Sequence, residues 1–409
     1  LFGLLVPLAM GLAPPNVILS GFASDGFFMA MSFLGLGTVL LSSGLSYRVL
    51  LLLLKRLPDT QFWHNLGLLA SGIMLTPMIP SANGRVTLAG PFAADMVDIL
   101  GLKPGGAAAT RLAVSAFIGA TLMSAVFLSS KSVNFVILGL LPPQLQYQMQ
   151  WIGWLHAGAV TGLAMFVLYL AAAALILGNN DKSRLSKDTI SAQLSLLGKV
   201  SSDEWGVVVA IFIFVAGIVT VSLHKIQPSW LGLTILCGLL LLGSLSKKEF
   251  REKIDWPFLM YLAEMVGVIN VFNYLGLDKW VSGNLTGLGI DQYLIGDFSL
   301  FIVLMCVIVF VLRLAVPISA AIVILVTLFM PLAEIKGINP WVVGFIILVL
   351  GEMWFFPYQC SYYLQLQEQN RNRGLYDEKT FLKFNLLMNV VKVAALFASI
   401  PYWKFLGFL

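Results

Sequence analysis

The sequence has 409 residues, of which 59% are hydrophobic and 11% are charged, with a net charge of +5. A mean hydropathy of +0.90 excludes a water-soluble domain, because such a domain needs a charged surface. Apolar runs of about 20 residues recur along the chain and predict membrane-spanning helices, since lipid leaves no partner for free backbone groups. We therefore expect an all-α polytopic membrane protein that binds no nucleic acid.

Spanning helices are predicted wherever an apolar run is long enough to cross a bilayer. Their ranges are 1–13, 26–45, 112–141, 152–178, 205–223, 229–246, 256–276, 341–366 and 381–408. Two segments, 62–99 and 297–334, are too long for one crossing and are interrupted by turn-forming residues. The interruptions at 76–85 and 313–320 contain prolines, which predict a re-entrant helical hairpin in each segment.

The distribution of lysine and arginine predicts the orientation of these elements. With both hairpins returning to their own side, sixteen basic residues lie on one face and four on the other. The larger group is Arg48, Lys55, Arg56, Lys103, Lys182, Arg184, Lys187, Lys199, Lys247, Lys248, Arg251, Lys253, Arg371, Arg373, Lys379 and Lys383; the smaller is Lys225, Lys279, Lys336 and Lys404. The first face is predicted to be cytoplasmic.

The order of helix, short amphipathic arm, hairpin, broken helix and helix occurs twice in opposite orientations, which predicts two inverted repeats. The broken helices are 112–141 and 341–366. The predicted divisions are a remnant N-terminal helix (1–19), the first repeat (20–178), a cytoplasmic linker (179–203), two scaffold helices (204–254) and the second repeat (255–409). Because the symmetry calls for one more helix and Leu1 is already apolar, we expect a helix to be missing before it.

A few charged side chains are predicted at membrane depth, where they usually line a cavity or pair with one another. The cations are Arg85, Lys131, Arg313 and Lys392, with Arg111 near a helix end, and the anions are Glu264 and Glu352. An excess of cations beside broken helices favours an anion site, with Arg85 and Lys131 jointly holding the negative charge. The alternative is that the cations pair with the two glutamates or extend to the membrane surface.

Polar residues next to these charges are candidates for hydrogen bonds to a substrate. They are Ser129, Ser130 and Asn134 in the first broken helix, and Gln359 and Ser361 in the second. Glu264 and Glu352 are interpreted as counter-ions or as protonatable coupling groups. The cysteines and histidines form no metal or haem motif, so we expect no cofactor.

The architecture resembles the divalent anion:sodium symporter family, the dicarboxylate, citrate and sulfate carriers of the ion-transporter superfamily, of which this chain looks like a divergent member. That family carries Ser-Asn-Thr at both hairpin tips and a Gly-Thr-Pro-Pro-Asn-like break in each broken helix. The positions that correspond here are Ser81-Ala82-Asn83 and Ala321-Ile322-Val323 at the tips (or Ser319-Ala320-Ala321 with a shift), and Ser130-Lys131-Ser132-Val133-Asn134 and Gln359-Cys360-Ser361-Tyr362-Tyr363 at the breaks.

The resemblance implies a homodimeric secondary transporter of a small anion, working by alternating access in the cell's inner (plasma) membrane. It also implies sodium binding at the tips, where Ser81 and Asn83 are candidate ligands. Because the second tip lacks such side chains and Arg85 and Lys131 are fixed cations, we expect weak sodium dependence or none, with exchange or proton coupling through Glu264 or Glu352.

Three other function classes are alternatives to a secondary transporter. An anion channel or uniporter on the same fold is the main alternative, and a receptor that senses an anion is another. An intramembrane enzyme is disfavoured, since the sequence has no His-Glu-x-x-His, paired midplane aspartates or serine dyad.

Overall fold

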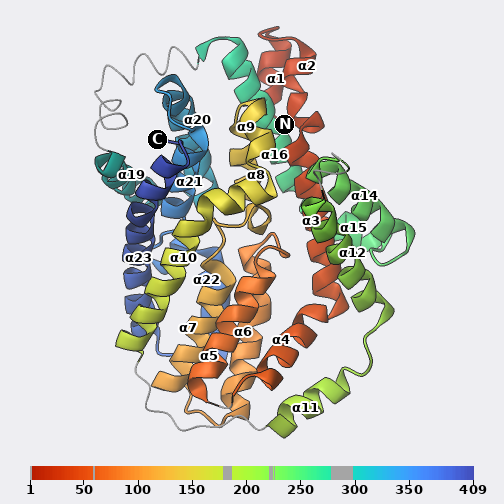
Figure 1. Ribbon diagram of the computed structural model, residues 1–409, viewed down its shortest axis with the longest axis vertical. Coiled ribbons are helices and arrows are strands. Elements are labelled where there is room, and N and C mark those ends of the chain that lie inside the picture. The colour runs from red at the N-terminus through yellow and green to blue at the C-terminus, as the bar shows by residue number, and fades with distance from the viewer. Residues whose placement is uncertain (1, 59, 178–186, 221–223, 225, 278–297) are drawn as a thin grey trace.

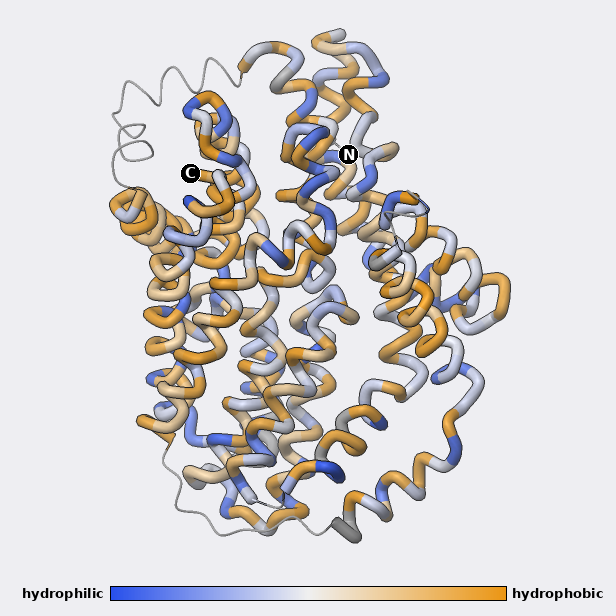
Figure 2. The backbone as a smooth tube through the Cα atoms, in the orientation of Figure 1, coloured by the Kyte–Doolittle hydropathy of each residue, from blue (hydrophilic) through white to orange (hydrophobic). Residues whose placement is uncertain are grey.

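Helices form all the regular structure in the part of the chain that the computed structural model describes, residues 2–58, 60–177, 187–220, 224, 226–277 and 298–409. The predicted all-α class is confirmed. Within these residues, α3 (Asp25–Ser43), α10 (Trp151–Ile176), α20 (Ile318–Ile335) and α23 (Glu378–Phe405) are long and apolar enough to cross a membrane. Hydrophobic residues occupy most positions along the helices (Figure 2). The chain is an integral membrane protein.

The two hairpins enter the molecule from opposite ends (Figure 1). The first consists of α5 (Gln61–Leu75) and α6 (Ala82–Ile99), and the second of α19 (Phe298–Arg313) and α20. Pro77 and Pro80 interrupt the first hairpin, and Pro317 precedes α20. The first interruption is shorter than the predicted 76–85, because Ser81 caps α6 by accepting a hydrogen bond from the Gly84 amide at 3.2 Å.

Both broken helices are present and run in opposite directions (Figure 1). The first is α7 (Ala107–Thr121), a 3₁₀ turn (Leu128–Ser130) and α8 (Ser132–Leu140), which leads through α9 (Pro143–Gln148) to α10. The second is α21 (Pro340–Gly351), a 3₁₀ turn (Pro357–Gln359) and α22 (Ser361–Arg373), which leads to α23. The α7 and α22 halves lie in the lower part of Figure 1, and the α8 and α21 halves in the upper part.

The breaks lie where two hydrophobic cores meet. One core includes α8, α21 and α3, and the other includes α5, α6, α7 and part of α22. Met353 belongs to the first core and Trp354 to the second. Irregular backbone at membrane depth is tolerated only inside protein or beside a cavity, and the breaks satisfy this condition.

The remaining helices lie around this centre. They are α1 (Phe2–Ala9), α2 (Pro15–Ile18), α4 (Leu45–Arg56), α11 (Lys187–Leu196), α12 (Ser202–Val219), α14 (Pro228–Leu241), α15 (Lys247–Glu252) and α16 (Trp256–Tyr274). The first segment is shorter than the predicted 1–13, since α1 ends at Ala9 before Gly11, which has positive φ, and two prolines.

The predicted linker 179–203 contains regular structure. Its residues up to 186 lie outside the described part, but α11 follows and lies near α4 at the lower end of Figure 1. Arg48 of α4 fixes the chain after α11 through an ion pair with Glu204 at 2.6 Å and a hydrogen bond to the Gly198 carbonyl at 2.9 Å. The amphipathic arm expected in the second repeat falls in 278–297, outside the described residues. The divisions of the chain given above remain predictions.

We expect both ends of the first hairpin to be accessible from one face of the membrane. In a protein whose three cysteines are replaced by alanine, T60C and K103C should react with an impermeant maleimide from the same side. Q144C, in α9 between the first broken helix and α10, should react from the other side. Labelling of T60C and K103C from opposite sides would mean that the segment crosses the membrane.

Candidate functional site

A cavity of about 270 Å³ lies where the hairpin tips meet the broken helices. Its lining comes from five segments of the chain, two in the predicted first repeat and three in the predicted second repeat, which includes α16. The residues are Pro80, Ser81, Ala82 and Asn83; Lys131, Ser132, Val133 and Val136; Asp255, Phe258 and Tyr261; Ile318 and Ser319; and Ser361 and Tyr362. Segments almost 300 residues apart therefore build one site.

The N-terminal ends of five helices meet at this cavity. Helices α6, α8, α16, α20 and α22 begin at residues 82, 132, 256, 318 and 361, each in or next to the lining. The first turn of a helix has amide groups without intrahelical partners, and the helix dipole is positive there. Such ends bind carboxylate, sulfate and phosphate groups. The backbone of this cavity therefore favours an anion.

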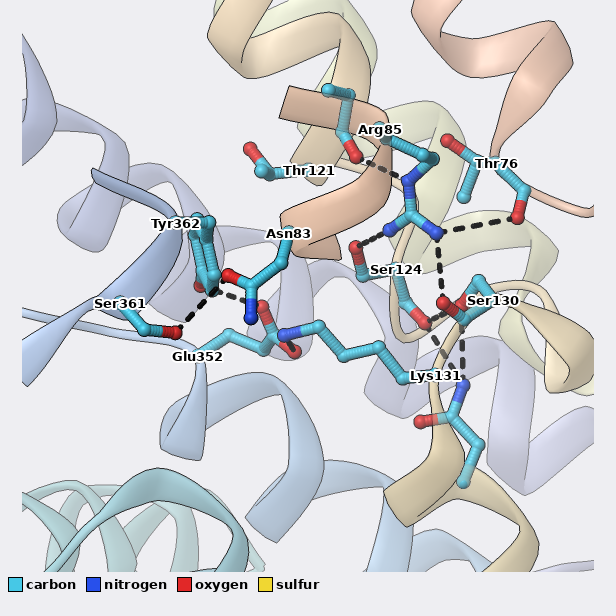
Figure 3. Close-up of polar contacts among 12 residues, drawn as sticks. Thr76, Asn83, Arg85, Thr121, Ser124, Ser130, Lys131, Glu352, Ser361 and Tyr362 are labelled. Carbon is cyan, nitrogen blue, oxygen red and sulfur yellow. Dashed lines mark hydrogen bonds and ion pairs between the residues drawn. The ribbon is translucent and has the colours of Figure 1, made fainter. Parts of the chain in front are cut away.

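Lys131 is the cationic side chain in the cavity lining, and it is already paired. It is 9% exposed, and its Nζ forms an ion pair with Glu352 Oε1 from the break of the other repeat (Figure 3). Nζ also lies 5.0 Å from the centre of the Tyr362 ring. The Tyr362 hydroxyl donates to Glu352 Oε2 at 3.4 Å, and Lys392 Nζ donates to the Glu352 backbone carbonyl at 2.8 Å.

Arg85 lies outside the cavity lining and is 1% exposed. Its guanidinium donates to the carbonyls of Ile79 at 2.5 Å, Ala120 at 2.6 Å, Ser130 at 2.8 Å and Thr76 at 3.5 Å. It also donates to Ser124 Oγ at 2.8 Å (Figure 3). These acceptors belong to the first tip and to the first broken helix. Arg85 therefore ties the two together instead of facing the cavity.

Arg313 has a corresponding position in the second repeat. It is 3% exposed and donates to the Gln359 carbonyl at 2.6 Å and to the Val316 carbonyl at 3.1 Å. Gln359 returns a hydrogen bond from Nε2 to the Arg313 carbonyl at 2.9 Å, and its Oε1 accepts from the Phe355 amide at 2.7 Å. Arg313 and Gln359 thus join the second hairpin to the second break, behind the cavity lining.

The other polar candidates of the first break stabilise its irregular backbone. Ser129 donates to the Pro77 carbonyl at 2.6 Å, and Ser130 to the Phe127 carbonyl at 2.8 Å. Asn134 donates to the Ser124 and Phe127 carbonyls, both at 2.9 Å. Of the predicted site residues, the structure places Ser81, Asn83, Lys131, Ser319 and Ser361 in the lining.

Two of these lining residues connect the repeats. Ser361 Oγ of the second break donates to Asn83 Oδ1 of the first tip at 3.1 Å (Figure 3).

Glu264 lies on α16 away from the lining, where it accepts a hydrogen bond from the Gly3 amide at 2.7 Å. Among the described residues, no three acidic, histidine or cysteine side chains are grouped as a metal site.

Sequence reasoning missed the contribution of α16. Asp255, Phe258 and Tyr261 are spaced by three residues and line one side of the cavity. Asp255 Oδ1 accepts a hydrogen bond from the Phe258 amide at 3.0 Å, as expected of an aspartate that caps the N-terminus of a helix. The second residue of α16 is a proline, which is also typical of a helix start. That capping pattern was the available signal. The acidic side chain makes this side of the cavity less favourable for an anion than the side formed by Lys131.

Comparison with known proteins identifies a family that matches nearly the whole chain and curated relatives that match about two thirds of it. The family described as "Sodium:sulfate symporter transmembrane region" matches residues 4–409. The putative malate transporter YflS of Bacillus subtilis is 22% identical over 69% of this chain and 60% of its own length. Dicarboxylate transporter 2.1 of Arabidopsis thaliana chloroplasts is 26% identical over 63% of this chain and 46% of its own length. The chain therefore spans at most about three fifths of these curated relatives.

A solved structure shares the fold. The YdaH transporter of Alcanivorax borkumensis, described as having an unusual topology, aligns with 96% of this chain and 88% of its own chain at a TM-score of 0.55. The sequence identity is 14%. At this level of identity the similarity concerns the arrangement of helices and not the substrate.

Proposed function

The chain belongs to the sodium:sulfate symporter transmembrane region family, and on that premise we propose that it is a secondary active transporter of a small divalent anion. The anion is of the dicarboxylate, citrate or sulfate class, and transport occurs by alternating access. The observation that carries the proposal is the cavity itself, in which helix N-termini from both repeats and Lys131 converge. Relatives named as malate and dicarboxylate transporters support the substrate class.

The anion is held mainly by the two tips and the two breaks. Amides at the starts of α6, α8, α20 and α22 hydrogen-bond its oxygens, and the hydroxyls of Ser81 and Ser319 add further donors. Lys131 supplies the positive charge. A cavity of about 270 Å³ is close to the lower end of the range for small-molecule sites, as a compact substrate requires.

Transport is proposed to depend only weakly on sodium, or not at all. A sodium ion needs several oxygen ligands, and the irregular backbone of the tips and breaks would be their source. The carbonyls of Ile79 and Ser130 already accept from Arg85, and those of Val316 and Gln359 from Arg313. A second cation near either guanidinium would also be repelled, by roughly 1–4 kcal/mol at 4 Å.

The test is uptake of labelled malate, citrate and sulfate into proteoliposomes, with sodium replaced by choline at constant pH and membrane potential. We expect at least one of these anions to accumulate, and preloaded unlabelled anion to accelerate uptake as a carrier requires. The absence of uptake for all three would overturn the proposed function, and flux without accelerated exchange would indicate a channel. A steep, sigmoidal dependence on sodium would overturn only the proposal of weak or absent sodium dependence.

Location and assembly complete the proposal. A relative named as an inner membrane protein of Escherichia coli is 20% identical over 67% of this chain, which supports placement in the cell's inner membrane. The homodimer implied by the family resemblance is also proposed. Mass measurement of the detergent-solubilised protein would reveal a monomer if this assembly is wrong.

A further inference from the structure

The cavity cation is neutralised before any substrate arrives. Lys131 and Glu352 are 9% and 5% exposed, and they form an ion pair between the breaks of the two repeats. Asp255 adds a negative charge to the cavity lining. A divalent anion entering this cavity would meet a lysine whose charge is already balanced, and it would be placed close to a second carboxylate. A change at Glu352 would free Lys131 to pair with the anion.

We propose that the protein also translocates protons, with one proton bound by Glu352 for each anion carried. This inference rests on the proposed function. On binding, a substrate oxygen takes the place of Glu352 beside Lys131 Nζ, and the Glu352 carboxylate accepts a proton that comes from bulk solution through water in the cavity. On release, the acid loses that proton and the ion pair with Lys131 forms again. No covalent bond other than the O–H bond is made or broken.

Burial favours this exchange over release of a free carboxylate. A charge in the interior needs a partner, and a carboxyl group that loses its cation is stabilised by becoming neutral. Both the empty and the loaded protein then keep Lys131 paired, first with Glu352 and then with the substrate. The charge that crosses the membrane is also reduced by one for each divalent anion.

Several groups surround the Glu352 carboxylate. Lys131 approaches from the first break, Tyr362 from α22, and Lys392 from α23 donates to the backbone carbonyl. Arg85, Arg313 and Cys360 lie within electrostatic range. The Tyr362 hydroxyl, 3.4 Å from Oε2, remains available to hydrogen-bond the neutral acid when Lys131 turns to the substrate.

Glu352 is preferred to the other carboxylates on geometric grounds. Glu264 lies outside the cavity and contacts α1 through the Gly3 amide. Asp255 lines the cavity, but it is exposed and accepts a hydrogen bond from the Phe258 amide at the start of α16. Among these three carboxylates, Glu352 is the one joined to Lys131 by a described ion pair.

The first experiment needs no variant. Malate and sulfate are added in parallel to detergent-solubilised protein in a weakly buffered solution between about pH 7 and 8, where the malate carboxylates are ionised. We expect uptake of one proton for each anion bound, measured with a pH indicator and compared with calorimetric binding. Binding without proton uptake would overturn the inference while leaving the proposed function intact, whereas failure of both anions to bind would count against the proposed function itself.

The second experiment identifies the residue. Linkage to one proton makes the wild-type affinity fall about tenfold for each rise of one pH unit within the range in which Glu352 is ionised in the empty protein and protonated in the complex. E352Q, which resembles the neutral acid, should bind with an affinity that does not change with pH. E264Q is the matched control and should keep the wild-type slope. An E352Q variant with the wild-type slope, or an E264Q variant without it, would overturn the assignment to Glu352.

Discussion

Replacing Lys131 with glutamine is expected to have the largest effect on anion binding and a separate effect on stability. A hydrogen bond to a charged group contributes about 1.5–3 kcal/mol, so its loss should weaken malate or sulfate binding about 10- to 100-fold. The substitution also leaves Glu352 buried without its cation. Removing one member of a buried ion pair costs about 3–5 kcal/mol, so the free energy of unfolding should fall by this order.

The double variant K131Q/E352Q separates these effects. Removal of both charges should restore most of the thermal stability, because no uncompensated carboxylate remains, while anion binding should stay weak. K404Q is the control for general loss of positive charge, since Lys404 is exposed and lies outside the cavity lining. Isothermal titration and thermal unfolding in detergent measure the two quantities. Wild-type affinity in the double variant would mean that the helix N-termini hold the anion without Lys131.

Replacing Arg85 with leucine is expected to destabilise the first repeat strongly. The substitution leaves the carbonyls of Thr76, Ile79, Ala120 and Ser130 without the donors they have now. Each unsatisfied buried group costs about 1–3 kcal/mol, so the free energy of unfolding should fall by about 3 kcal/mol or more. Anion binding should weaken as a consequence, because the first tip, which carries Ser81 and Asn83, loses its connection to the first break.

The stability of the substrate-free protein distinguishes a structural role of Arg85 from direct binding of the substrate. If Arg85 acts by joining the tip to the break, R85L lowers the melting temperature of the protein without substrate. If Arg85 binds the substrate directly, R85L weakens binding at unchanged melting temperature. R85K is the matched control, since it keeps the charge but loses the planar fork that reaches several carbonyls at once.

For the sodium proposal, R85A should gain thermal stability on addition of sodium if the released carbonyls can bind the ion, and the wild type should not.

The sequence by itself determined the class of fold and the positions of its irregular segments. Hydrocarbon admits only helices where backbone faces lipid, so composition and apolar runs predicted the helical elements. Pro77, Pro80, Pro317 and Pro357 interrupt helices by local chemistry, whatever the distant surroundings. The hairpin tips and broken helices could therefore be located from the sequence. Ser81, Asn83 and Ser319 were predicted from the resemblance of the tips to the family motif, and Lys131 and Ser361 from polar interruptions of apolar helices. The structure places all five in the cavity lining.

The tertiary structure decided where the charged side chains are directed. Arg85 and Arg313 lie close to the tips in sequence, but their long side chains reach carbonyls both of their own hairpin and of the neighbouring break, and the sequence does not show the latter contacts. Lys131 and Glu352 are 221 positions apart, and only the packing of one repeat against the other brings them into contact. The part played by α16 in the cavity has the same origin, because a helix with apolar residues on every side does not show from its sequence which face meets a neighbour.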